Sequence, residues 1–296
     1  NHEKNYSFNR CFNFIIFFGH VMLYRLFIKI YPGSQVWVIM GCFLLPSTLY
    51  FSSGIHKDGL VLLLMAVVIY GVYQSLSKNR ISIKRLLFIL AGLILLFLVR
   101  NFILLALLPA LFAWILVAKT KWNTALVFIS VYLFGGLAFF NINAVITKIN
   151  PPDIIVKKQE AYKSLPIAAT QIELAALQPT VKSFASNIPQ ALGHVLFLPY
   201  PGQQPVKSLL PFSFELYFYL FLLLLLFFFK KKDNLPADKL LMFFTLFFIL
   251  TVFLFIGYIV PNIGSLIRYR SLYLPFIITP VLCSLNWEKM RGRFVI

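Results

Sequence analysis

A short polar stretch between two apolar runs carries the residues with the clearest potential for chemistry. PSTLYFSSGIHKDG (46–59) places His56, Lys57 and Asp58 in consecutive positions. A carboxylate beside a cation and an imidazole can take a proton from a hydroxyl group while the cation holds an anion. A structural alternative also fits, because Gly54 suits the end of one helix and Asp58 suits the N-cap of the next. Capping leaves His56 and Lys57 unexplained.

Three arginines offer a place to hold an anion. Arg100 interrupts a long apolar run, and LIRYR (266–270) supplies Arg268 and Arg270. An arginine at membrane depth is costly unless it is paired or faces a cavity, and its guanidinium can bind two phosphate oxygens at once. If 266–270 is extended, Arg268 and Arg270 share one face. The alternatives are snorkelling of Arg100 and ordinary interfacial anchoring of LIRYR.

The composition predicts a membrane protein. Of the 296 residues 60% are hydrophobic and 12% are charged, whereas a soluble domain has about 25% charged residues. The net charge of +18 does not predict a nucleic-acid partner, because the basic residues lie in short clusters between apolar runs. The three cysteines lie in apolar segments without CxxC spacing, so we predict neither a disulfide framework nor a metal site. No cofactor is predicted, and a divalent metal lacks support because only one carboxylate accompanies the candidate cations.

Apolar runs of spanning length predict an all-α, polytopic transmembrane helix bundle. About nine spans are expected. They are 11–30, 36–54, 59–76, 86–99, 102–118, 124–140, 213–229, 239–260 and 272–287. The pair 86–99 and 102–118 could instead form one long broken helix, because only Arg100 and Asn101 separate the two halves. The chain is thereby divided into transmembrane helices at 1–140, a long extracytoplasmic loop at 141–212 and further transmembrane helices at 213–296. Within the loop, 153–165 and 181–197 have the periodicity of short amphipathic helices.

Basic residues on alternate connections set the predicted orientation. The basic connections contain Lys78, Arg80, Lys84 and Arg85, then Lys119 and Lys121, then Lys230, Lys231, Lys232 and Lys239, and finally Lys289, Arg291 and Arg293. If these face the cytoplasm, the N-terminus lies outside and the C-terminus inside. The chain begins with Asn and not Met, so we expect one or more upstream spans to be absent from it. Only Asp58 and Glu215, among nine carboxylates, then lie at the outer mouth of the spans, and His20 is expected to face the bundle or the inner interface.

The polar stretch at 46–59, the VRNFILLALLPAL junction and RYRSLYLPFIITPVL together resemble a known superfamily. They are similar to elements of bacterial polytopic polysaccharide polymerases of the EpsG-like and Wzy-like kinds and of related GT-C-type glycosyltransferases. The resemblance implies transfer of sugars from a polyprenyl-phosphate carrier to a glycan acceptor on the outer side of the bacterial cytoplasmic membrane. It also carries over Lys57 and Asp58 from the first element, Arg100 from the second, and Arg268 and Arg270 from the third. Many GT-C enzymes have an acidic residue or pair in their first outer loop, and any such loop is expected upstream of this sequence, so the resemblance does not identify the catalytic base.

The leading hypothesis is therefore a membrane glycosyltransferase or polysaccharide polymerase. Asp58 is expected to act as base with Lys57 and His56 assisting, and Arg100, Arg268 and Arg270 are expected to bind the lipid-linked phosphate. One alternative is a transporter or flippase for an anionic lipid-linked glycan. The sequence argues against it, because it shows no internal repeat and no symmetric pair of broken spans, which are features of many transporters. Another is a non-catalytic membrane assembly subunit in which the polar turn is only a turn.

Overall fold

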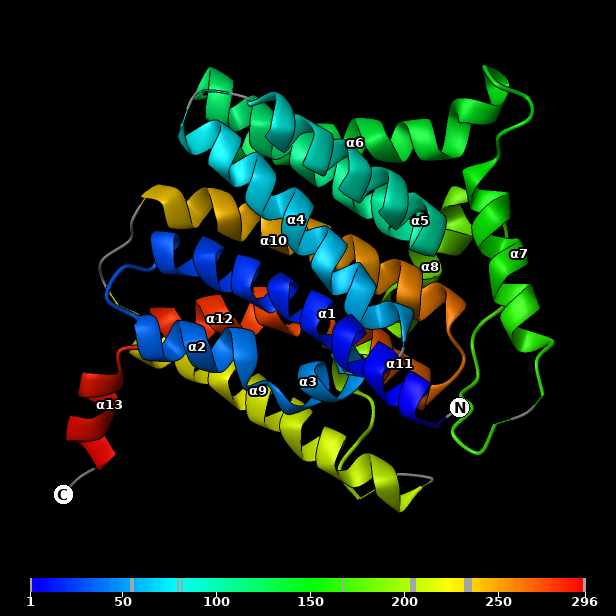
Figure 1. Cartoon of the computed structure of the whole chain (residues 1–296). Coiled ribbons are helices and arrows are strands. Elements are labelled where there is room, and N and C mark those ends of the chain that lie inside the picture. The colour runs from blue at the N-terminus through cyan, green and yellow to red at the C-terminus, as the bar shows by residue number, and fades with distance from the viewer. Residues whose placement is uncertain are drawn as a thin grey trace. The chain divides into compact units, whose positions relative to one another are not determined.

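The structure is a computed structural model that describes residues 2–53, 56–78, 80, 82–166, 168–202, 206–231 and 236–294 (Figure 1). Within these ranges it contains helices and two isolated β-bridges but no strands, so the predicted all-α class is confirmed. The helices are α1 (His2–Ile30), α2 (Gln35–Phe43), α3 (Pro46–Ser52), α4 (Lys57–Ser77), α5 (Ile83–Thr120), α6 (Thr124–Asn141), η1 (Ile142–Ala144), α7 (Pro151–Lys163), α8 (Val181–Phe197), η2 (Lys207–Leu209), α9 (Leu210–Phe229), α10 (Pro236–Ile259), α11 (Ile263–Ser271), α12 (Leu274–Ser284) and α13 (Trp287–Phe294).

Many of these helices are long and apolar enough to cross a membrane. Among the described residues there are six such helices, or up to eight spans if each of two bent pairs counts as one. The six are Arg10–Ile30, Lys57–Ser77, Ile83–Thr120, Thr124–Ala144, Lys207–Phe229 and Lys239–Ile259. The bent pairs are α2 with α3 and α11 with α12. Helices of this length and hydropathy are consistent with a multi-pass membrane protein, as the composition predicts.

The predicted spans 86–99 and 102–118 both lie in α5, which is broken once. Arg100 has φ −152° and ψ 87°, outside the helical region, between two helical segments. An unbroken helix of 38 residues would be about 57 Å long, nearly twice the hydrocarbon thickness of a bilayer. The break divides α5 into two segments that are each close to the length of one span. The count of up to eight spans treats α5 as one span, whereas the predicted nine treat its two halves as separate spans.

The chain divides into two compact units, each assembled from distant stretches of sequence. Unit 1 contains residues 1–104, 215–242 and 271–296. Unit 2 contains residues 105–214 and 243–270. Asp58 and Arg100 therefore belong to unit 1, and Arg268 and Arg270 belong to unit 2.

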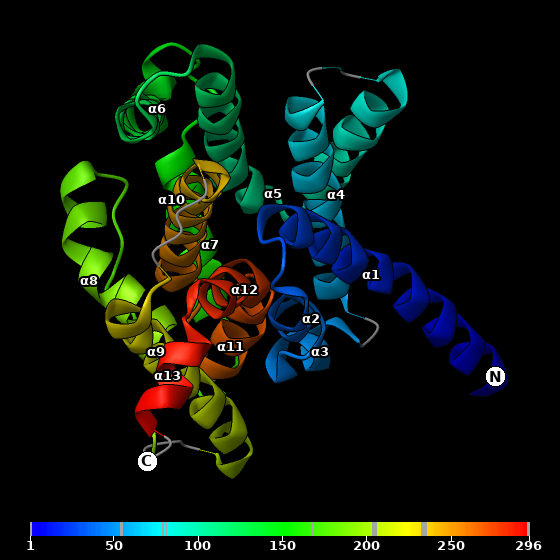
Figure 2. The same cartoon turned by 90° about the vertical axis from the view of Figure 1, so that its left-hand side faces the viewer.

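Unit 1 is built around α1, which packs against α2 and α4, while α2 packs against α12 (Figure 2). Small residues make these contacts close. A Cβ atom at Gly41 would lie 2.3 Å from the Thr279 hydroxyl, and one at Gly19 would lie 2.8 Å from the Leu63 Cα. Close approach through small residues is a usual way for membrane helices to associate. A second part of the core joins α9 to α12, and it consists of Leu45, Tyr219, Leu222, Phe229, Leu274, Ile278, Val281, Leu282 and Leu285.

The break between α2 and α3 has a local cause. The two helices are bent by 46°, and Pro46 is the first residue of α3. Proline has no N–H to donate and disfavours the helical region for the residue before it. Leu45 accordingly is extended, with φ −76° and ψ 115°. The polar stretch that begins at Pro46 is therefore positioned by a proline-induced break.

Unit 2 contains both helices that were predicted for the long polar stretch. α7 begins and ends two residues before the predicted 153–165, and α8 coincides with the predicted 181–197. Both are fastened to α10: the Gln159 side chain donates to the Tyr258 carbonyl at 2.7 Å, and the Tyr258 hydroxyl donates to the Phe184 carbonyl at 2.8 Å. These hydrogen bonds join α7 and α8 to the C-terminal part of α10. The location of the two helices at the outer face stays a prediction.

Candidate functional site

Asp58 and Arg100 form a buried ion pair in unit 1. Arg100 Nη2 donates to Asp58 Oδ1, and the two side chains are 4% and 0% exposed. Asp58 lies in the first turn of α4, where the partial positive charge of the helix terminus favours a carboxylate. Arg100 is the residue at which α5 breaks. An ion pair with almost no access to solvent or lipid is unusual in an apolar protein, and such intramembrane charges mark functional sites by default.

The N-cap interpretation of Asp58 is wrong, because α4 begins at Lys57. The N-cap residue is His56, which makes no capping hydrogen bond with its side chain. Asp58 is instead the second residue of the helix, and its carboxylate is engaged by Arg100. The snorkelling interpretation of Arg100 is also wrong, because its guanidinium donates to the buried carboxylate of Asp58. Gly54, the other residue of the capping interpretation, lies outside the described residues.

Tyr273 and the ends of two further helices lie around the ion pair. Tyr273, in the break between α11 and α12, is fully buried and close enough to interact electrostatically with both Asp58 and Arg100. Beside it, the Thr48 hydroxyl of α3 donates to the Ser271 carbonyl at 2.7 Å. Non-helical backbone at membrane depth is tolerated where it is buried in protein or lines a cavity. The ion pair thus sits where interrupted helices meet inside unit 1.

Comparison with protein-family models, with curated proteins and with solved structures gave no match. The chemistry of the site therefore has to be inferred from its own side chains. A guanidinium can exchange a carboxylate for a phosphate, and a carboxylate so released can accept a proton. Over the described part of the chain, His, Cys, Asp and Glu side chains form no group of three that could hold a metal ion. The absence of a cofactor stays a prediction.

His20 links α1 to both halves of the α2–α3 span. Its Nδ1 lies 2.7 Å from the Cys42 carbonyl oxygen and its Nε2 lies 3.2 Å from the Ser52 hydroxyl. Because a carbonyl only accepts, the neutral ring carries its proton on Nδ1 and accepts from Ser52 at Nε2. The Ser52 carbonyl also packs close to the start of α4, since a Cβ atom at Gly59 would come within 2.6 Å of it. The expectation that His20 faces the bundle is confirmed, but no local pattern in the sequence indicated its partners.

Glu215, the other carboxylate predicted at the outer mouth, caps the N-terminus of α3. Both of its oxygens accept from the Ser47 backbone N–H at 3.1 Å, and Oε1 also accepts from the Ser47 hydroxyl at 3.0 Å. The Tyr219 hydroxyl donates to the same oxygen at 2.6 Å. The N-cap residue of α3 is Leu45, which has no side-chain acceptor of its own. A carboxylate from α9 thus supplies the cap that the local sequence lacks.

Replacing Glu215 by alanine should therefore destabilise the α2–α3 span. We expect a loss of about 1–3 kcal/mol in the free energy of unfolding, because the cap is lost and the Ser47 donors stay partly buried. Glu215→Gln should lose less, since the amide keeps one acceptor oxygen. Thermal unfolding of the detergent-purified variants measures both effects, with Tyr219→Phe as the control that removes a single donor. An alanine variant that unfolds at the wild-type temperature would contradict the capping role.

Arg268 and Arg270 would share one face only if 266–270 were extended, but both residues are helical. α11 covers Ile263–Ser271, and residues two apart on a helix point about 200° from each other. Arg270 is buried, and its Nη1 donates to the Val195 and Leu198 carbonyls at 2.7 and 2.8 Å. It thus satisfies the C-terminal end of α8, where a cation is favoured. Arg268 is half-buried and contacts Tyr269 through its guanidinium.

The predicted site residues fall into three groups. Asp58 and Arg100 are in direct contact and buried. His56 and Lys57, immediately before Asp58, are exposed at the start of α4. Arg268 and Arg270 lie on α11 in unit 2. Sequence reasoning missed Tyr273 altogether, because a tyrosine in an apolar segment gives no signal that it will face a buried charge.

Proposed function

We propose that this protein is an integral membrane glycosyltransferase or polysaccharide polymerase that uses a polyprenyl-phosphate-linked sugar at the outer face of the bacterial cytoplasmic membrane. The observation that carries the proposal is the buried Asp58–Arg100 pair at the break of α5. Nine spans, with the N-terminus outside and the C-terminus inside, belong to the same proposal. This orientation puts the start of α4 and the break of α5 on the outer side.

In the proposed mechanism, the ion pair is the resting state of the site. The phosphate of the lipid carrier competes with Asp58 for Arg100, and the released carboxylate becomes available as a general base. The acceptor hydroxyl oxygen then forms a bond to the anomeric carbon of the sugar while its proton passes to Asp58. The bond from that carbon to the carrier phosphate breaks, and its electron pair leaves with the phosphate oxygen. Arg100 stabilises the charge that develops there.

The remaining predicted residues take smaller parts in this proposal. Lys57 and His56 are exposed beside Asp58 and would contact the phosphate or the glycan as it enters. That Arg268 binds a phosphate stays a prediction; its half-buried guanidinium contacts the Tyr269 hydroxyl at 3.4 Å. We remove Arg270 from the phosphate-binding set, because its Nη1 supports the end of α8.

A transporter of an anionic lipid-linked glycan is the second candidate, and one observation favours it. Two spans are broken, α2–α3 and α11–α12, although the sequence gave no sign of such a pair. Interrupted helices often form the substrate sites of secondary transporters. In vesicles, a transporter would move labelled lipid-linked glycan across the bilayer without changing its length. A glycosyltransferase would change the length or the acceptor of the glycan.

The test of the enzyme proposal is turnover by Asp58→Asn and Arg100→Lys in a reconstituted membrane, normalised to folded protein. Loss of a general base should lower turnover about 10²–10⁴-fold, while binding of the lipid carrier persists in Asp58→Asn. Glu215→Gln is the control, because it makes the same carboxylate-to-amide change at a partly buried position of unit 1 that the proposal assigns to capping alone. Unchanged glycan product with Asp58→Asn would refute the mechanism and leave the assembly-subunit role open.

A further inference from the structure

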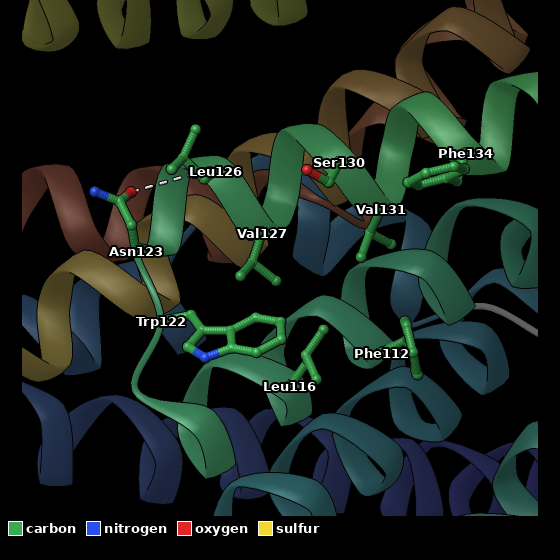
Figure 3. Close-up of a pocket in the computed structure, with 9 residues that line it drawn as sticks. All are labelled: Phe112, Leu116, Trp122, Asn123, Leu126, Val127, Ser130, Val131 and Phe134. Atoms are coloured by element: carbon green, nitrogen blue, oxygen red, sulfur yellow. Dashed lines mark hydrogen bonds between the residues drawn. The ribbon is translucent and has the colours of Figure 1, made fainter.

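An apolar groove lies on unit 2 between the second half of α5 and α6. Its volume is about 510 Å³, which is in the range of small-molecule sites, about 300–1,000 Å³. Figure 3 shows Trp122 lying across one end of the groove, below Val127, with Phe112 and Phe134 toward the other end. Phe112, Trp122 and Phe134 are between 59% and 69% exposed. The groove therefore opens to the surroundings of the helices.

Two lysines stand at the Trp122 end of the groove. Lys119 follows Phe112 and Leu116 at helical spacing, so it continues the face of α5 that lines the groove. Lys121 immediately precedes Trp122, and both lysines are exposed. No acidic residue occurs between Asp58 and Asp153, so neighbouring positions in the sequence supply no negative charge. The groove thus combines an apolar channel with a positively charged end.

Lys121 occupies a backbone conformation that would suit glycine better. Its φ is +57°, and its N–H donates to the Val117 carbonyl at 2.9 Å, which is the left-handed ending of a helix that glycine usually provides. A side chain with a β-carbon is disfavoured there. A lysine at this position is explained if its ammonium group has a ligand. Lys121→Gly then separates the two roles, because it suits the backbone while it removes the charge.

We propose that this groove binds an anionic membrane lipid, with one acyl chain along the apolar channel and the phosphate on Lys119 and Lys121. Charge complementarity selects the anionic class, because basic residues near a membrane surface attract acidic headgroups. Trp122 suits the boundary between chain and headgroup, where its amphipathic ring is favoured. The site is separate from Asp58 and Arg100 and does not depend on the glycosyltransferase proposal.

Native mass spectrometry of the detergent-purified chain tests the site with phosphatidylglycerol and phosphatidylcholine of identical acyl chains. Wild-type protein should retain phosphatidylglycerol preferentially. The Lys119→Ala/Lys121→Gly variant should bind it about 30-fold more weakly, because each lysine near an anionic headgroup contributes about fivefold in affinity. Ser130→Phe, which adds a ring to the groove lining, should reduce binding while both lysines remain.

Lys78→Gly is the matched control, because Lys78 is an exposed lysine at the C-terminal end of α4 that is not among the residues lining the groove. It should leave phosphatidylglycerol binding unchanged. Equal retention of the two lipids by the wild type, or an equal loss in Lys78→Gly, would overturn the proposal. So would a change in oligomeric state on groove substitution without a change in lipid binding, since it would show that a second copy of the chain covers the groove.

Discussion

Arg100→Ala should unfold a large fraction of the protein under conditions in which the wild type is stable. The substitution leaves the Asp58 carboxylate, which is fully buried, without the guanidinium that neutralises it. Breaking a buried ion pair from one side costs about 3–5 kcal/mol, because an uncompensated charge stays in the interior. Much of the total stability of a typical domain, about 5–15 kcal/mol, would be lost. Retention of monodisperse protein after heating in detergent measures the effect.

The matched control removes both charges at once. Asp58→Asn/Arg100→Gln leaves two neutral amides that can hydrogen-bond to each other, so it should unfold nearer the wild-type temperature than either Arg100→Ala or Asp58→Ala. A double-mutant cycle over these variants gives the coupling between the two positions. If the single and double variants were equally unstable, the cost would come from packing at the α5 break and not from the buried charge.

The same double variant also separates folding from function. If the ion pair serves only to join α4 to α5, the folded double variant should retain the activity of the wild type. If Arg100 binds the carrier phosphate and Asp58 takes the proton, the folded double variant should be inactive. Activity and stability therefore have to be measured on the same preparation, since a loss of activity alone is expected under both roles.

The positions of the helices were largely predictable, because apolar runs of spanning length and amphipathic periodicity are local signals. α8 coincides with its predicted range, and the break of α5 falls at Arg100, where the sequence separated two spans. The contact between Asp58 and Arg100 was not predictable in the same way. The two residues are 42 positions apart, and only the packing of the first half of α5 beside α4 brings them together.

Two of the local alternatives are not met, both in short segments in which helix and extended structure give similar patterns. Aspartate is common at N-caps, which makes capping an alternative for Asp58, but α4 starts one residue earlier, at Lys57. The five residues 266–270 are too few to distinguish the 3.6-residue period of a helix from the two-residue period of a strand. The signal that distinguishes them lies upstream: the Asn262 side chain accepts from the Ser265 backbone N–H at 3.0 Å, as an N-cap residue does. Reading Asn262 as a cap predicts that α11 is helical.

Arg270→Ala should destabilise the protein more than Arg268→Ala does. Arg270 is 4% exposed and donates to two backbone carbonyls at the end of α8. Its removal leaves both carbonyls buried without this donor, at about 1–3 kcal/mol for each unsatisfied group, and it also leaves a cavity. The half-buried Arg268 contacts a tyrosine hydroxyl at 3.4 Å, and a contact of that kind contributes about 1 kcal/mol or less.

Thermal unfolding of the two alanine variants measures this difference, and Arg270→Lys shows how much of it depends on the guanidinium. Lysine keeps the charge but not the planar donor geometry, so Arg270→Lys should recover only part of the lost stability. If Arg270 were instead a phosphate ligand, its alanine variant would unfold like the wild type and lose binding of the lipid carrier. Equal destabilisation by both alanine variants would contradict the greater structural role assigned to Arg270.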